Sequence, residues 1–146
     1  MAIVNRDLDT SQKKESVQSV VASLALGASH AVIAVPQYPV ELKYVAVSPV
    51  AIAAAPVLSL EIIRFVTGAG LTVIPGIAAT LAVAAHGTSG VQGFSLAAPG
   101  STLLNLQSGD MLGIRIPGAS GAVTTMGVNV IWNPTQDIKG AFGSQT

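Results

Sequence analysis

The sequence predicts an all-β protein: one antiparallel β-sandwich domain over residues 17–146, preceded by a short polar arm over residues 1–16. Two patterns lead to this expectation. From residue 17 onward, runs rich in Val, Ile and Leu recur at spacings of roughly 8 to 15 residues, separated by clusters of Gly, Pro, Ser or Asn. Within several runs, apolar and polar side chains alternate, which is the pattern of a strand with one buried face.

The arm is polar and mixed in charge, so we expect either a short helical turn or an arm that is mobile or grips a partner. The expected strands then follow in chain order: 17–26, 31–35, 40–47, 57–66, 71–74, 91–97, 111–116 and 123–132. The last two alternate most clearly, and they place two sets of side chains on the core face: Leu112, Ile114 and Ile116, and then Met126, Val128, Val130 and Trp132.

The connections between the runs carry turn residues. Glycines occur in segments 67–70, 88–90, 99–101, 108–110 and 117–121, where positive φ angles are expected. All eight prolines are predicted to lie at the ends of runs, where a missing backbone donor does least harm. Segment 77–85 stays open: its alanines suit a helix, its alternation suits a strand, and we predict strand or irregular structure.

The composition predicts a protein that buries part of its surface against partners. Half of the residues are apolar, only 10% are charged and 4% are aromatic. A monomer with so few charges would expose larger apolar patches than soluble monomers tolerate. An obligate homo-oligomer is the simplest arrangement that covers them.

Several partners and chemistries are not expected. A membrane-spanning helix needs about 20 uninterrupted apolar residues, whereas prolines interrupt the most apolar stretches, 45–58 and 71–85. A net charge of zero gives no electrostatic footprint for nucleic acid. The absence of cysteine excludes disulfides and fits folding in a reducing cytoplasm. Residues 1–16 also lack the apolar segment of a signal peptide.

Asp110, in the stretch NLQSGDMLGIRI, is the most conspicuous candidate for a catalytic or metal-binding carboxylate. Nothing near it in sequence offers a second carboxylate or a histidine. The favoured interpretation is therefore a tight turn through Ser108 and Gly109, with Asp110 accepting a backbone N–H as the chain enters the next strand.

Other motifs fail in the same way. The two histidines, His30 and His86, stand alone, and two ligands do not close a metal site. Ser29, Ser89 and Ser120 each have a glycine two residues earlier but none two residues later, so no G-x-S-x-G nucleophile motif exists. The glycines of segment 68–70 lack the third glycine of a dinucleotide loop. We assign no catalytic, cofactor-binding or metal-ligating residue, and expect that the protein is not an enzyme.

Two charged pairs remain. Glu61 and Arg64 lie three residues apart in one expected strand, so they point to opposite faces and each is expected to meet a neighbouring strand or subunit. Glu41 and Lys43 share a face and indicate a solvated stripe.

Residues 57–134 resemble the small jelly-roll cement, or decoration, proteins of tailed bacteriophage capsids. The features that carry the resemblance are an L-x-x-G-D turn at Leu106, Gly109 and Asp110, the apolar strand 111–116, the Gly/Ala/Thr-rich loop 117–125, and a last strand that closes in Trp132 and Pro134.

The resemblance implies a jelly-roll sandwich that assembles as a homotrimer on the outside of a capsid and stabilises contacts between major capsid protein subunits. The protein would be made in the host cytoplasm, and deleting arm 1–16 should weaken attachment without harming the fold. The alternative is a trimeric tail or fibre module that binds a surface glycan. Few aromatic residues are available for a sugar platform, and Trp132 is expected in the core.

Overall fold

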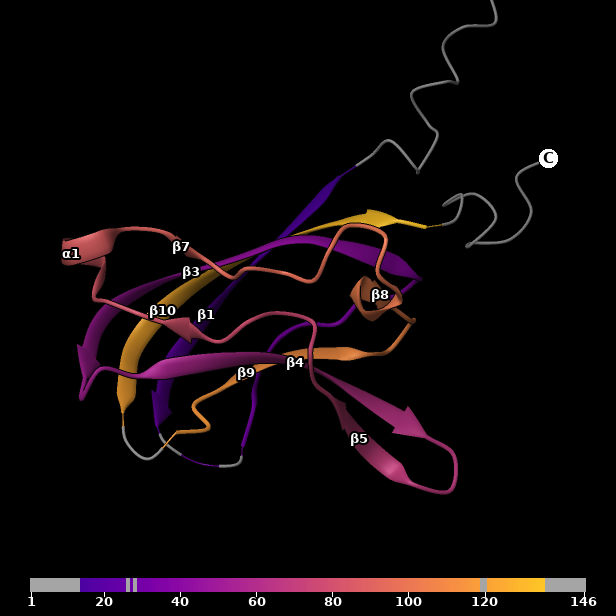
Figure 1. Ribbon diagram of the computed structural model, residues 1–146, viewed down its shortest axis with the longest axis horizontal. Coiled ribbons are helices and arrows are strands. Elements are labelled where there is room, and N and C mark those ends of the chain that lie inside the picture. Colours follow the sequence, from indigo (N-terminus) through magenta and orange to yellow (C-terminus); the bar gives the residue numbers. More distant parts are fainter. Residues whose placement is uncertain (1–13, 26, 28, 119–120, 136–146) are drawn as a thin grey trace, which may run out of the picture.

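The computed structural model describes residues 14–25, 27, 29–118 and 121–135. Two antiparallel sheets pack against each other, which confirms the predicted all-β sandwich (Figure 1). One sheet has the strand order β1-β10-β3-β7, with β8 also paired to β3. The other has the order β2-β9-β4-β5, with β6 also paired to β4. Strands β1 to β4 therefore fall alternately in the two sheets, and so do β9 and β10.

The elements follow one another along the chain with few helical residues. They are β1 (Glu15–Ala25), β2 (Ala31–Ala34), β3 (Val40–Ala53), β4 (Val57–Val66), β5 (Gly70–Ile74), β6 (Leu81–Ala82), α1 (His86–Ser89), β7 (Gln92–Gly93), the 3-10 turn η3 (Thr102–Leu104), β8 (Asn105–Leu106), β9 (Met111–Arg115) and β10 (Ala122–Pro134).

The core lies between the sheets and is built by the alternation that the sequence shows. In β10, which pairs with both β1 and β3, the side chains of Met126, Val128, Val130 and Trp132 are all buried. In β9 and just after it, Leu112, Ile114 and Ile116 are fully buried. Both predicted core faces are confirmed, and Trp132 lies in the core as expected.

The prediction that every proline ends a strand is wrong for Pro49. Strand β3 continues through this residue to Ala53, and Pro49 lies opposite Met126 of β10. On its other side β3 pairs with β7 only at Ala46 and Val47, and with β8 only near Val40. Around Pro49 the described part of β3 is thus an edge, where a missing donor breaks no ladder.

The open segment 77–85 is irregular apart from the two residues of β6 and an isolated bridge from Ala78 to Leu96. This agrees with the prediction of strand or irregular structure. The expected strand 91–97 shrinks to the two residues of β7, because the chain pairs with β3 only there and then bonds to segment 77–79, with Leu96 opposite Ala78.

The predicted boundary of the arm is also wrong by two residues. Glu15 and Ser16 already belong to β1, where they pair with Trp132 and Ile131 of β10. The Glu15 carboxylate accepts hydrogen bonds from the Trp132 indole N–H at 3.0 Å and from the Tyr38 hydroxyl. Residues 1–13 of the arm lie outside the described residues.

Candidate functional site: two uncharged surfaces

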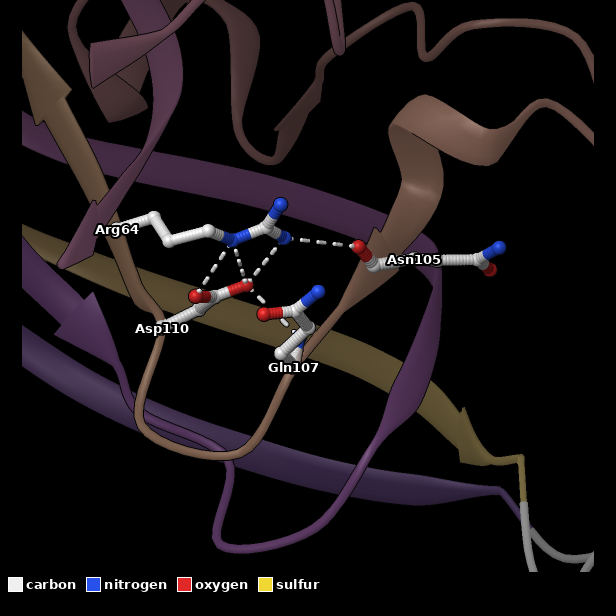
Figure 2. Close-up of polar contacts among 4 residues, drawn as sticks. All are labelled: Arg64, Asn105, Gln107 and Asp110. Carbon is white, nitrogen blue, oxygen red and sulfur yellow. Dashed lines mark hydrogen bonds and ion pairs between the residues drawn. The ribbon is translucent and has the colours of Figure 1, made fainter. Parts of the chain in front are cut away.

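Asp110 forms a clasp with Arg64 (Figure 2). Arg64 comes from β4, and Asp110 directly precedes β9. The Arg64 Nε donates to both carboxylate oxygens, at 3.0 and 3.2 Å, and its Nη2 donates to Oδ2 at 2.6 Å and to the Asn105 carbonyl at 3.5 Å. The carboxylate also accepts the backbone N–H of Gln107 at 2.7 Å. Gly109 has φ 86°, so the predicted turn with a backbone hydrogen bond to Asp110 is confirmed.

The clasp engages Asp110 within the fold. Asp110 is 3% exposed, and both of its oxygens accept hydrogen bonds from Arg64, while Oδ2 also accepts the Gln107 N–H. The hydrogen bond to Asp110 raises the pKa of Arg64 and keeps the guanidinium charged. Beside the clasp lies a depression of about 410 Å³ with Ile62, Ile74 and Leu103 in its wall. The clasp ties the β8–β9 turn to β4.

A second polar cluster joins Glu61 to Arg115 and His30 on the outer side of the β2-β9-β4-β5 sheet. The Arg115 Nε donates to Glu61 Oε1 at 2.5 Å and its Nη2 contacts Oε2 at 3.4 Å. The His30 Nε2 lies 2.9 Å from Oε1. Burial of Glu61 raises the pKa of its carboxyl, but the hydrogen bonds from Arg115 and His30 outweigh that effect and hold the pKa below its usual value.

Gly113 makes room for this cluster. A Cβ at this position would lie 3.0 Å from the Cβ of His30 and 3.2 Å from the Cδ1 of Ile63. The imidazole therefore packs across the backbone of β9 and reaches Glu61. Glu61 and Arg64 each find a partner at or next to the neighbouring strand β9, as the sequence predicts.

The remaining candidates do not converge. His86, Ser29 and Ser89 are exposed, and Ser29 directly precedes His30 of the Glu61 cluster; Ser120 falls outside the described residues. Within the described ranges, no three His, Asp or Glu side chains come close enough to hold a metal ion. Glycines 68 and 70 turn the β4–β5 hairpin with positive φ and lead into a strand, not a helix. Lys43 contacts Glu41 at 2.6 Å on a half-exposed face, as expected of the solvated stripe.

The first surface without charge is the tip of the β4–β5 hairpin, defined by the side chains of Phe65, Leu71 and Val73. Phe65 pairs with Leu71 across the hairpin, and Val73 pairs with Ile63, so the three side chains share one face. Phe65 is 70% exposed and Leu71 is 65% exposed. Figure 1 shows that the hairpin projects from the body of the sandwich. No charged residue occurs from position 65 to position 74.

The second uncharged surface is a groove of about 390 Å³ on the outer face of the β1-β10-β3-β7 sheet. Small residues, Gly127 and Ala46, form its floor, and Val20, Tyr44 and Val91 stand beside them. Val20 is 72% exposed and Val91 is 64% exposed.

The segment that follows Val91 at the edge of the groove is held in place by hydrogen bonds and packing. Gln92, next to Val91, exchanges two side-chain hydrogen bonds with the backbone of Ala84, at 2.8 and 2.6 Å. The Tyr44 ring packs 3.4 Å from where a Cβ on Gly93 would be.

Sequence reasoning missed both surfaces as sites, because each joins strands that are distant in the chain. The sequence does contain one signal for these surfaces. Residues 65–74 and 16–25 carry no charge, although both segments have exposed positions.

Comparison of the chain with protein-family models, with curated proteins and with solved structures yields no match. Among the described residues, no helix is both long and apolar enough to cross a membrane. The resemblance to capsid cement proteins therefore rests on the sequence motifs around Asp110 and Trp132 alone.

Proposed function

We propose that this protein is a structural component of a virion: a jelly-roll homotrimer that binds the outside of a tailed-phage capsid and stabilises contacts between major capsid protein subunits. No catalytic role is part of the proposal. The strand orders β1-β10-β3-β7 and β2-β9-β4-β5, with β1 to β4 and then β9 and β10 alternating between the sheets, support a jelly-roll path.

The observation that carries the proposal is the exposure of large apolar side chains on two surfaces that have no charge. Phe65 and Leu71 on the hairpin, and Val20 and Val91 beside the groove, are each more than half exposed. Contiguous exposed apolar patches mark interaction sites, since water contact with them is unfavourable. Meanwhile the two buried carboxylates, Asp110 and Glu61, are engaged by arginines within the fold. Among the described residues, the two surfaces therefore offer apolar contact area, and the buried carboxylates serve the fold.

The first test is the native mass in solution, by light scattering after gel filtration. A trimer has a mass of 3 × 14.7 = 44.1 kDa. A species at that mass supports the homotrimer, and a monomer at all concentrations contradicts it.

The second test is attachment to particles. We expect the protein to co-sediment with capsid shells lacking it, and to protect them against heat. The arm is removed by deleting residues 1–13, because Glu15 belongs to the fold. Weaker co-sedimentation of this truncated protein supports an arm that contacts the capsid, and unchanged co-sedimentation contradicts that role.

One observation favours the alternative, a trimeric module that binds a surface glycan. The ring of Tyr44 stands half-exposed beside the groove, and Gln18 and Asn129 supply amide groups there. An aromatic face with neighbouring amides is a common way to bind a sugar ring. Binding on a glycan array that is lost in Tyr44→Ala supports this function, whereas an array without hits removes it.

A further inference from the structure

We propose that the trimer is closed by a contact between unlike surfaces: the hairpin tip of one copy inserts into the groove of the next copy. This inference rests on the proposed homotrimer and identifies the two surfaces that build it. It assigns Phe65 and Leu71 as the inserted side chains, and Gly127 as the floor on which they rest.

The hairpin needs a covering layer. Strand β9 pairs with β4 only from Ser59 to Ile63, so the rows Phe65–Leu71 and Val66–Gly70 belong to a ribbon of two strands. A two-stranded ribbon alone in water is marginally stable at best, and a third layer against its apolar face stabilises it. Phe65 and Leu71 are the side chains that such a layer would cover.

The groove matches the hairpin tip in size and in its lack of charge. A cavity of about 150 Å³ accommodates a benzene ring, so the groove of about 390 Å³ has room for the Phe65 ring with Leu71 beside it. None of the residues that line the groove is charged, and none of those in the tip is charged. Insertion therefore buries apolar area without burying an unpaired charge.

The contact has to form between copies. The hairpin belongs to the β2-β9-β4-β5 sheet, whereas the groove lies on the outer face of the other sheet. The hairpin projects away from that sheet and on the side of the molecule opposite α1, so it does not reach the groove of its own copy (Figure 1). Two different surfaces on one chain make a head-to-tail contact, which gives a ring when the rotation closes. Three copies then use all three hairpins and all three grooves.

The test uses one variant of each surface in the full chain. The hairpin variant is Phe65→Ser with Leu71→Ser. The groove variant is Gly127→Gln, chosen because a Cβ on Gly127 meets nothing within 4 Å, so the fold has space for the side chain while the groove is filled. The control is Val35→Ser, an exposed valine that belongs to neither surface. Circular dichroism and thermal unfolding show that each variant is folded.

We expect each surface variant to run as a monomer of 14.7 kDa, and the control to remain at 44.1 kDa (3 × 14.7). Mixing the two surface variants is the decisive step. The hairpin variant keeps a working groove and the groove variant keeps a working hairpin, so the mixture should form a 1:1 dimer of 2 × 14.7 = 29.4 kDa.

Other outcomes separate this inference from the proposed function. A hairpin variant that still forms a 44.1 kDa trimer overturns the inference and leaves the homotrimer standing. Such a trimer that no longer binds capsid shells places the hairpin against the capsid and also overturns the inference. Two monomeric variants that stay monomeric when mixed overturn it as well, because unlike surfaces must complement each other. A wild-type monomer overturns both proposals.

Discussion

Asp110 and Glu61 are the charged side chains that the fold buries within its described residues, and each meets an arginine. A buried carboxylate without a partner would be costly, since desolvation disfavours its charged form. Here Arg64 and Arg115 compensate that cost, and both contacts join β4 to residues at or beside β9. Asp110 and Glu61, which stand out in the sequence as candidate reactive groups, therefore stabilise the β2-β9-β4-β5 sheet.

We predict that Asp110→Asn destabilises the fold by about 2 kcal/mol. A hydrogen bond to a charged group contributes about 1.5–3 kcal/mol, and the partly exposed Arg64 recovers some hydration when its partner loses charge. Urea unfolding followed by Trp132 fluorescence measures the change. The control is Glu41→Gln, whose pair with Lys43 is more exposed and should cost less than about 1 kcal/mol. Equal effects of the two substitutions would contradict the assignment of the clasp.

The Glu61 cluster predicts a dependence of stability on pH. Burial raises the pKa of Glu61, but the bonds from Arg115 and His30 dominate and lower it beneath its usual 4.5. A lowered pKa in the folded state means that ionised Glu61 contributes its full stabilisation above about pH 4.5, and that this is lost as the pH falls through the folded value. Glu61→Gln should therefore be less stable than wild type near neutral pH, with the gap closing in acid.

Urea unfolding of both proteins at about pH 7, 4.5 and 3 measures that gap. Glu41→Gln again serves as the control, because its carboxylate is more exposed. A difference between wild type and Glu61→Gln that stays constant across these pH values would argue that the carboxylate has an ordinary pKa.

At the scale of the strands, substitution by alanine should change the stability of the fold in opposite directions at two glycines, Gly121 and Gly127. A Cβ on Gly121, which has φ 129°, would lie 2.8 Å from the Cα and Cβ of Pro56, where β10 begins beside β4. Gly121→Ala should cost at least about 2 kcal/mol through strain and overlap. Gly127→Ala in the middle of β10 meets open space and should add about 0.5 kcal/mol, because glycine weakens a strand interior. Urea unfolding at low protein concentration compares them, and equal effects would contradict the packing described.

Strand β1 predicts where the chain tolerates truncation. Deletion of residues 1–13 keeps Glu15, whose carboxylate accepts hydrogen bonds from Trp132 and Tyr38. Burial of Tyr38, and then its hydrogen bond to Glu15, raise the pKa of the Tyr38 hydroxyl to about 12. Deletion of residues 1–16 removes that carboxylate and should cost about 2 kcal/mol more. The unfolding midpoint in urea, followed by Trp132 emission, separates the two proteins. A truncation at residue 13 that is already as unstable as the longer one would be the contrary result.

The elements that the sequence predicts well are those whose faces alternate. Strands β4, β9 and β10 match the expected runs to within two residues, because each has a buried face that imposes a period of two. The continuation of β3 beyond residue 47 was missed, since Pro49 and the run of alanines that follows resemble a strand end. Their positions are fixed by pairing with β10, which is tertiary information.

The clusters were missed for the same physical reason. Arg64 and Asp110 are 46 residues apart, and His30 and Glu61 are 31 apart, so only the sheet register brings them together. The sequence does correctly indicate that Glu61 and Arg64 point to opposite faces. It contains no local signal that names their partners.

At the scale of the whole molecule, the proposed homotrimer predicts that stability depends on assembly through the two uncharged surfaces. When a trimer unfolds to three chains, the ratio of folded to unfolded protein depends on the square of the chain concentration. A tenfold increase in chain concentration therefore adds about 2 × 1.4/3 ≈ 0.9 kcal/mol per chain to the free energy of unfolding. For a chain of this length that corresponds to a rise in Tm of roughly 2–4 °C. We therefore predict that the Tm of the wild type rises by this amount for each tenfold step in concentration.

The variant with Phe65→Ser and Leu71→Ser should have a Tm that does not vary with concentration, because it lacks the inserted side chains. At high dilution, where the wild type has dissociated, the two proteins should differ only by the small cost of changing exposed residues, which is usually within about 0.5 kcal/mol. Differential scanning calorimetry over two decades of concentration distinguishes this from an intrinsic effect. A Tm gap that persists unchanged at every dilution would mean that Phe65 and Leu71 stabilise the single chain, and that the hairpin tip packs within its own copy.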